Sequence, residues 1–291
     1  MPYKSIVVPL GGDEGGKSAL QSAYLLGQST AAHISAFHVR TDSKEAVPLL
    51  GEGMSGAMIE EIIDLADRES GDRETSAQAI FDEFCKEHDL AVVQTAPEQL
   101  PEKVTASWSI FVGREDEIVA SRGRVADLVV VGCPRTDSDR PSLMTLHAAI
   151  FETGKAVLIV PPQAAKTVGA RVAIAWNGSA EVARAVSAAK PVLIHAQSVQ
   201  VICLETEKSR TRLGGEELVA HLGWEGIKAS QSNLETNGRP VGEALLAECA
   251  EQDVDLLVMG AYTHSRVMQI ILGGVTRHVV ESTNIPVLMS H

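Results

Sequence analysis

A glycine-rich turn near the N-terminus carries the residue types that hold phosphate in many nucleotide hydrolases. The segment GGDEGGKSAL matches the pattern G-x-x-x-x-G-K-[ST] through Gly11, Gly16, Lys17 and Ser18. In that pattern, backbone N–H groups surround the phosphates, the lysine neutralises them and the hydroxyl binds Mg²⁺. The apolar run SIVVPL precedes the match, so a strand, a turn and a helix are expected in the order that such a loop requires.

The elements around this turn occur twice in the chain. Three segments recur in the same order: SIVVPLGGDEGG (5–16) as RVAIAWNGSAEV (171–182), ADLVVVG (126–132) as VDLLVMG (254–260), and KAVLIVP (155–161) as IPVLMSH (285–291). Each copy alternates apolar runs with amphipathic helical patterns, which predicts parallel strands with helices on both faces. We therefore expect an α/β fold of two tandem Rossmann-like or flavodoxin-like domains, each with a mostly parallel five-stranded sheet.

The segment VPPQAAKTVGA separates the two copies, so we predict an N-terminal domain over residues 1–163 and a C-terminal domain over 168–291. In the second copy, strands are expected at 172–176, 199–205, 227–233, 255–260 and 286–290, and helices at 180–196, 215–224, 241–252 and 273–282. The first copy is longer. Residues 54–90 form one helical pattern that can break near Gly71, and 95–104 is an irregular connection. This extra segment is a candidate lid or interface.

The repeat argues against a working phosphate loop at residues 11–18. The equivalent turn in the second copy, WNGSAEVARA, has no Gly-Lys-Ser. A phosphate loop also needs a strand that ends in a metal-supporting carboxylate, whereas Asp127 precedes its strand. We interpret the glycines as a turn, Lys17 and Ser18 as the start of a helix, and the pattern as a chance match.

The sequence from Gly260 to the C-terminus resembles the signature of universal stress proteins. Their nucleotide-binding members carry G-x2-G-x9-G-[ST] after the fourth strand. Here Gly260 and Gly273 occupy the first and third positions, Thr263 stands at the second glycine and Gly274 at the Ser or Thr. Thr276 supplies a hydroxyl two residues later. The resemblance spans both halves and implies a tandem universal stress protein.

A loop of this kind has the chemistry to bind phosphate. Backbone N–H groups and the positive end of the following helix attract anions. Gly273 and Gly274 permit close approach of the backbone, and His264 or Arg266 can add positive charge. The alternative is that the two glycines form an ordinary turn and Thr276 is an ordinary residue at a helix start.

The resemblance also implies an adenine contact after the first strand, where the family places an aspartate. Asn177 stands there in the second copy. Its amide both donates and accepts hydrogen bonds, although an Asn before Gly178 is equally typical of a turn. Trp176 either stacks on the base or belongs to the core. In the first copy Gly11 occupies the aspartate position and the paired glycines are absent, so this half is expected to serve as a built-in partner.

Composition narrows the class of protein further. The formal net charge is −13 and no cluster of lysine or arginine occurs, which argues against nucleic-acid and membrane partners. The four cysteines lie too far apart for a metal site and are expected to be reduced thiols. No signal peptide or membrane-spanning stretch is recognisable. We expect a cytoplasmic protein and assign no catalytic residue and no metal ligand.

The expected function is a stress-response role in which the C-terminal half binds ATP, with Mg²⁺ only if ATP binds. The alternatives are slow ATP hydrolysis and a ligand-free scaffold that acts through unidentified protein partners. The resemblance further suggests that AVLIV (156–160) and PVLMS (286–290) pair edge to edge within one chain. Such pairing makes an intramolecular pseudo-dimer and covers two apolar edges. Whether two chains then associate as a homodimer stays open.

Overall fold

The structure is a computed structural model, and it describes residues 2–40, 56–133, 143–204, 214–261 and 274–291. The N-terminal half consists of β1 (Ser5–Pro9), α1 (Glu14–Gly27), η1 (Gln28–Thr30), β2 (His33–Arg40), α3 (Gly56–Glu87), β3 (Ala91–Val92), β4 (Thr105–Val112), α4 (Glu115–Gly123), β5 (Leu128–Gly132), α5 (Leu143–Glu152) and β6 (Ala156–Val160). The C-terminal half consists of β7 (Arg171–Trp176), α6 (Ala180–Leu193), β8 (Ser198–Cys203), α7 (Gly215–Trp224), β9 (Ala229–Asn233), α8 (Val241–Glu251), β10 (Leu256–Gly260), α9 (Gly274–Ser282) and β11 (Val287–Ser290).

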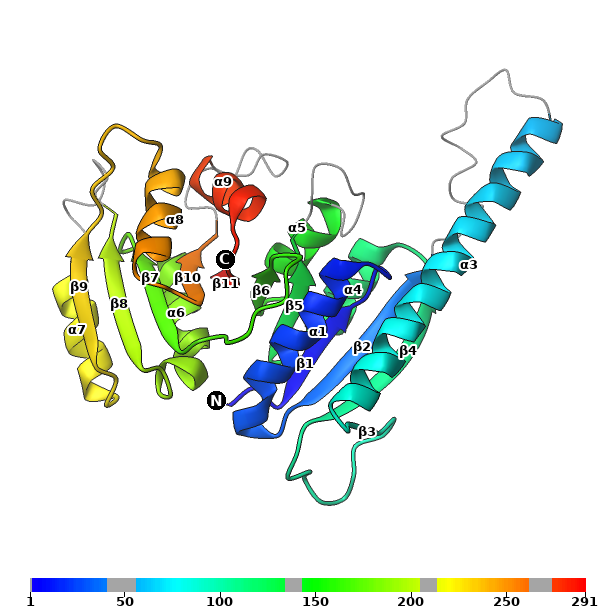
Figure 1. Cartoon of the computed structure of the whole chain (residues 1–291), viewed down its shortest axis with the longest axis horizontal. Coiled ribbons are helices and arrows are strands. Elements are labelled where there is room, and N and C mark those ends of the chain that lie inside the picture. Colours follow the sequence, from blue (N-terminus) through cyan, green and yellow to red (C-terminus); the bar gives the residue numbers. More distant parts are fainter. Residues whose placement is uncertain (1, 41–55, 134–142, 205–213, 262–273) are drawn as a thin grey trace.

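The strands form one continuous eleven-stranded sheet in the order β3-β4-β2-β1-β5-β6-β11-β10-β7-β8-β9 (Figure 1). Within each half all pairs are parallel, and both halves repeat one arrangement, β4-β2-β1-β5-β6 and β9-β8-β7-β10-β11. The α/β class and the two similar halves are confirmed. The predicted domain limits at residues 163 and 168 fall between β6 and β7 and stay a prediction.

The two halves meet at β6 and β11, which are antiparallel. Val157 faces Met289 and Ile159 faces Val287 across this pair. The expected edge-to-edge pairing of the two terminal strands is therefore confirmed, and it makes the chain an intramolecular pseudo-dimer. The phenol of Tyr3 also crosses between the halves and donates a hydrogen bond to the carbonyl of Ala188 at 2.6 Å.

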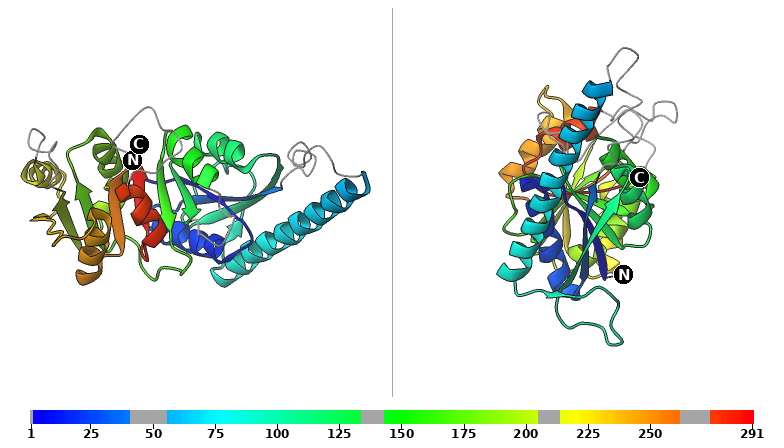
Figure 2. Two further views of the ribbon diagram at one scale, coloured as in Figure 1. Left: turned by 90° about the horizontal axis from the view of Figure 1, so that it is seen from above. Right: turned by 90° about the vertical axis from the view of Figure 1, so that its right-hand side faces the viewer.

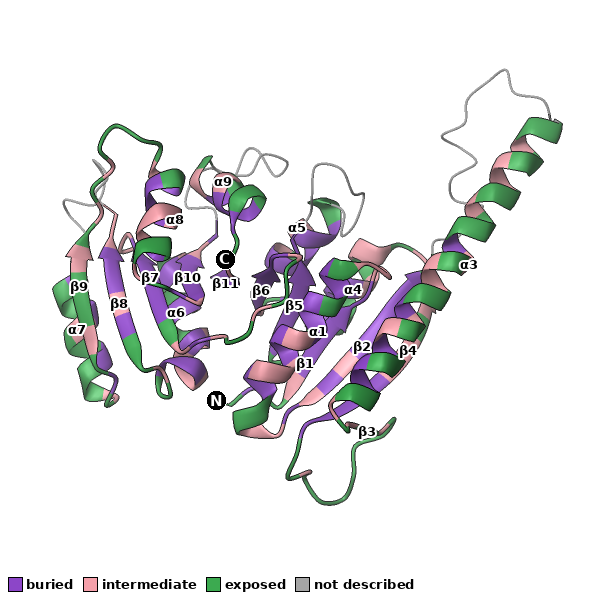
Figure 3. Ribbon diagram, viewed as in Figure 1, coloured by how far each residue is buried: buried purple, intermediate pink, exposed green. Residues whose placement is uncertain are grey.

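Helices cover both faces of the sheet, as the uninterrupted aliphatic strands predict. One core cluster contains residues of α1, α3, α6 and α7, and the other contains residues of α4, α5, α8 and α9. Successive residues of one strand alternate between them: Ile6 and Val8 belong to the first cluster and Val7 to the second. The strands next to the junction are accordingly buried, while the outer faces of the helices are exposed (Figure 3).

The extra length of the N-terminal half includes α3, which runs from Gly56 to Glu87 without a break. The possible break near Gly71 is absent, and the helical pattern over 54–90 is confirmed as one helix. Ala77, Phe81 and Phe84 in its second half are buried against the sheet. Its first half extends beyond the sheet, where Met58 and Leu65 are exposed (Figure 2). None of the helices in the described ranges combines the length and the apolarity that crossing a membrane requires.

Candidate functional site

The predicted nucleotide site lies where β7 and β10 end. The two strands are parallel neighbours, with Met259 beside Ala175, so the residues that follow them share one edge of the sheet. From this edge Asn177 leads into α6 on one face, and Ala261 leaves β10 on the chain path to α9, which covers the other face. Ligands of doubly wound sheets bind at such a switch point, outside the carboxyl ends of the strands.

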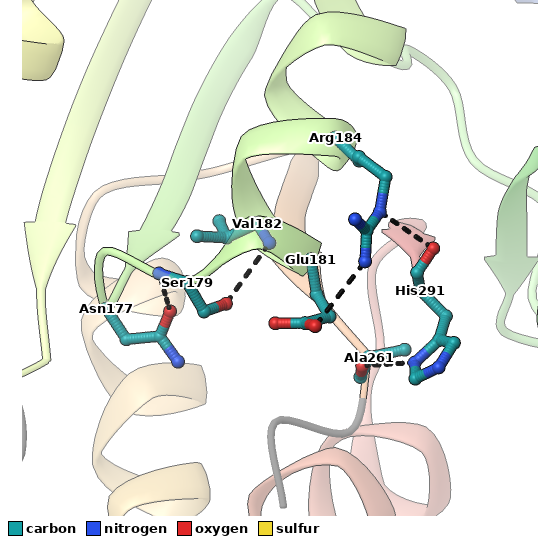
Figure 4. Close-up of polar contacts among 7 residues, drawn as sticks. All are labelled: Asn177, Ser179, Glu181, Val182, Arg184, Ala261 and His291. Atoms are coloured by element: carbon teal, nitrogen blue, oxygen red, sulfur yellow. Dashed lines mark hydrogen bonds and ion pairs between the residues drawn. The ribbon is translucent and has the colours of Figure 1, made fainter.

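Asn177 shapes the turn between β7 and α6. Its Oδ1 accepts a hydrogen bond from the backbone N–H of Ser179 at 3.0 Å, and Gly178 adopts a positive φ of 68° (Figure 4). Ser179 then caps α6, because its Oγ accepts from the N–H of Val182 at 3.4 Å. Asn177 therefore stabilises the turn, which is one of the two roles expected for it. Its contact with adenine stays a prediction.

A charged network that sequence reasoning missed lies beside this turn. Glu181 Oε1 and Arg184 Nη2 are 3.4 Å apart, and Arg184 Nε donates to the carbonyl oxygen of His291 at 2.9 Å. The His291 ring in turn lies 3.3 Å from the carbonyl of Ala261 (Figure 4). The C-terminal residue thus ties the start of α6 to the end of β10.

The pKa of Glu181 is lowered within this network. Partial burial acts in the opposite direction, but hydrogen bonds from its own N–H and from Ser179, together with the positive charge of Arg184, outweigh it. Glu181 therefore stays ionised at neutral pH and compensates Arg184.

Gly260 is required for packing at the end of β10. A Cβ at this position would lie 2.7 Å from the backbone nitrogen of Val182 and 2.9 Å from Cβ of Glu181. Because real Cβ atoms do not approach that closely, only glycine lets the first turn of α6 lie against the strand. The first glycine of the predicted signature thus has a structural role that is independent of any ligand.

Of the other seven predicted site residues, three are described by the structure and four are not. Trp176 is buried in the first core cluster, with 9% of its surface exposed. Gly274, at the start of α9, is exposed and Thr276 is buried. The remaining four, Thr263, His264, Arg266 and Gly273, lie outside the described residues.

Comparison with known proteins identifies the family of the C-terminal half and the fold of the whole chain. The model of the universal stress protein family matches residues 160–291. Residues 160–291 thus form a universal stress protein domain. A universal stress protein from Archaeoglobus fulgidus DSM 4304 has the same fold with a TM-score of 0.64 at 15% identity, over 98% of this chain and 94% of that one. A protein of unknown function from Pseudomonas aeruginosa PAO1 gives 0.55 at 14% identity, over 98% and 92%. No curated protein matches the sequence.

The equivalent turn of the N-terminal half, between β1 and α1, is filled by groups of the chain itself. Asp13 caps α1 and accepts from the N–H of Gly16 at 3.0 Å, so a carboxylate occupies the helix end where a phosphate would bind. Gly12 has a φ of 84° and packs under α3, where Ser76 Oγ donates to its carbonyl at 2.9 Å. The helix begins at Glu14, three residues earlier than expected.

Lys17 and Ser18, the last two residues of the G-x-x-x-x-G-K-[ST] pattern, are also accounted for by this packing. Lys17 is exposed, whereas Ser18 is buried and its hydroxyl lies 3.4 Å from the carbonyl of Gln163. Ser18 is therefore committed to packing against the segment that follows β6. These contacts agree with our interpretation of the pattern as a chance match.

Within the described residues, other polar clusters do not form a second site. Two surface grooves lie between the halves, one beside Tyr3 and His195 and one beside Lys155 and Arg184, and neither is lined by the predicted nucleotide residues. Across the part of the chain that the structure describes, no group of three or more His, Cys, Asp or Glu side chains has the geometry of a metal site.

Proposed function

We propose that this chain acts as a tandem universal stress protein, that it binds an adenine nucleotide at the carboxyl edge of β7 and β10, and that binding regulates its contact with a partner. The observation that carries the proposal is the difference in charge between two equivalent turns. In the N-terminal half, Asp13 places a carboxylate on the first N–H groups of α1. In the C-terminal half the cap is the neutral Ser179. A carboxylate at a helix start repels an anion, so the C-terminal turn is the better neighbour for a phosphate-bearing ligand.

The surroundings of this turn support the same choice. Arg184 balances the charge of Glu181, and α9 has no acidic residue in its first turn. A phosphate beside α9 would therefore meet the positive end of a helix whose own first turn carries no negative charge. The base is expected beside Asn177, whose amide lies at the end of the neighbouring strand.

Isothermal titration calorimetry with ATP, ADP and AMP, with and without Mg²⁺, tests this proposal. The wild-type protein and Lys17→Ala are expected to bind. Gly273→Val is expected to abolish binding, because its side chain obstructs the backbone approach to phosphate. Asn177→Ala is expected to weaken binding by about tenfold, the value of one hydrogen bond of about 1.4 kcal/mol. Binding that is lost only in Lys17→Ala would move the site to the N-terminal half.

A scaffold without a ligand is the second candidate. It is favoured by the closed turn of the N-terminal half, where Asp13 and α3 occupy one of the two switch points. If none of the three nucleotides binds, the scaffold replaces the nucleotide proposal. Phosphate release measured on the same samples separates a slow ATPase from a binding protein, since hydrolysis must be lost with binding in Gly273→Val.

A further inference from the structure

One outer edge of the sheet is long, apolar and open. β4 pairs with β2 along all eight of its residues, from Thr105 to Val112. On its other side, β3 pairs only with Thr105 and Ala106. Within the described residues, no strand pairs with the stretch from Ser107 to Val112, and this stretch contains no charged residue and no proline. Such an edge is a template for another strand unless something blocks it.

The backbone contacts at the ends of β4 determine which groups point outward. The N–H groups of Thr105 and Gly113 donate toward β2, at 3.1 and 3.0 Å, so the odd-numbered residues face that strand. The carbonyl of Ala106 accepts from Val93 at 2.7 Å, so the even-numbered residues face away. Trp108, Ile110 and Val112 therefore direct their N–H and C=O groups toward the open edge.

The side chains of the same three residues share one face of the sheet, because residues at i, i+2 and i+4 of a strand project alike. Trp108 lies toward α3, where its ring is 5.3 Å from that of Phe81. Ile110 and Val112 are 43% and 65% exposed. Among the described residues, apolar side chains and backbone groups without a strand partner thus coincide along this edge.

The opposite outer edge of the molecule provides a matched contrast. β9 occupies in the C-terminal half the place that β4 occupies in the N-terminal half. Its sequence, ASQSN, is polar and only five residues long. An edge of that composition is compatible with water, whereas SWSIFV in β4 is not blunted in the ways that usually prevent strand addition.

We propose that β4 of a second copy of this chain pairs antiparallel with β4 about a two-fold axis at Ile110. Identical strands are self-complementary in this arrangement, as a closed dimer requires. Ile110 then faces Ile110 of the second copy and Trp108 faces Val112, so every outward N–H and C=O of the three residues gains a partner. The chain already extends its sheet in this way at β6 and β11, where aliphatic edge strands pair antiparallel.

Sedimentation velocity over a range of micromolar concentrations tests the proposal. The wild-type protein is expected to dimerise, and Ile110→Lys to weaken dimerisation at least about tenfold, because two like charges would face each other across the axis. Val112→Lys provides a second, more exposed variant. The matched control is Gln231→Lys, at the middle of β9, which is expected to dimerise like the wild type. A monomeric wild-type protein, or an unchanged dimer in both β4 variants, would overturn the proposal.

A charge-pair experiment tests the register. Ile110→Lys and Ile110→Glu are each expected to be monomeric, and a mixture of the two to restore a heterodimer, because opposite charges then face each other. Circular dichroism and thermal unfolding of each variant establish that the fold is kept. Monomers that fail to associate on mixing would overturn pairing at Ile110.

Discussion

Gly132 and Gly260 end β5 and β10, where the first helix of each half passes close to the strand. A Cβ at Gly260 would lie 2.7 Å from a backbone nitrogen of α6, whereas one at Gly132 would lie 3.3 Å from Gly15. We expect Gly260→Ala to lower the free energy of unfolding by about 2–3 kcal/mol, and Gly132→Ala by about 1 kcal/mol or less, because overpacking a rigid contact costs about 1–3 kcal/mol. Urea unfolding of the two variants measures this; equal losses would contradict the packing role of Gly260.

The buried thiol of Cys249 makes the free energy of unfolding depend on pH in the alkaline range. Burial, with a smaller contribution from Glu248, raises its pKa from 9.0 to about 12. Above pH 9 the unfolded chain loses this proton while the folded chain keeps it, so the free energy of unfolding falls as pH rises toward 12. At pH 10 the loss is about 1.4 kcal/mol. Urea unfolding at pH 7 and 10 should show a larger drop for the wild type than for Cys249→Ala; identical drops would refute this.

At the scale of elements, one carboxylate in each half holds the start of two strands together. Asp255 precedes β10 and accepts from the N–H groups of Gly169, Ala170 and Arg171, at 3.1, 3.1 and 2.8 Å. Asp127 precedes β5 and accepts from two N–H groups at the start of β1, at 2.8 and 2.9 Å. Both lie at the end of the sheet opposite the carboxyl ends of β7 and β10.

Asp255 accepts three of these hydrogen bonds and Asp127 accepts two, so the loss of Asp255 is expected to destabilise the fold more. Hydrogen bonds to a charged group contribute about 1.5–3 kcal/mol when buried, and less here because several of these groups are exposed. We expect Asp255→Ala to lower the free energy of unfolding by about 2 kcal/mol and Asp127→Ala by about 1 kcal/mol. Chemical denaturation provides the measurement. A larger loss for Asp127→Ala would show that bond number does not govern the effect, and nucleotide binding should be unchanged in both.

The elements themselves were largely predictable, since the aliphatic runs and helical periodicities locate the strands and helices of the C-terminal half. For α3 the sequence predicted the helical stretch but left open whether it breaks at Gly71. No atom approaches a Cβ built at Gly71 within 4 Å, so the helix pays only the intrinsic cost of glycine, about 1 kcal/mol, and continues. The two-residue strand β3 also carries too little periodicity to be recognised.

The candidate site was predictable only where a motif is local. Asn177 and Gly260 were found because the segments after their strands resemble the local motifs of universal stress proteins. The contact of Arg184 with His291 was missed, because it joins residues 107 positions apart. A partial signal existed in the spacing of Glu181 and Arg184, which lie three residues apart just after a helix cap.

At the scale of the whole molecule, the halves are bound together by more than their linker. β6 and β11 join them into one sheet. Cys133 Sγ donates to the carbonyl of Val280, and the ring of Phe151 lies 4.4 Å from that of His291. Both core clusters contain residues from each half. Loss of either half would expose a fully buried aliphatic strand of the other, so neither is expected to remain folded while the other unfolds.

This coupling predicts a single cooperative unfolding transition. Trp108 reports on the N-terminal half and Trp176 on the C-terminal half, so variants that keep only one of them should give urea curves with the same midpoint. Cleavage at a protease site inserted between residues 163 and 168 should leave the two halves together in gel filtration under native conditions. Separate midpoints, or release of one half on cleavage, would mean that the β6–β11 pair joins two independently stable units rather than one cooperative sheet.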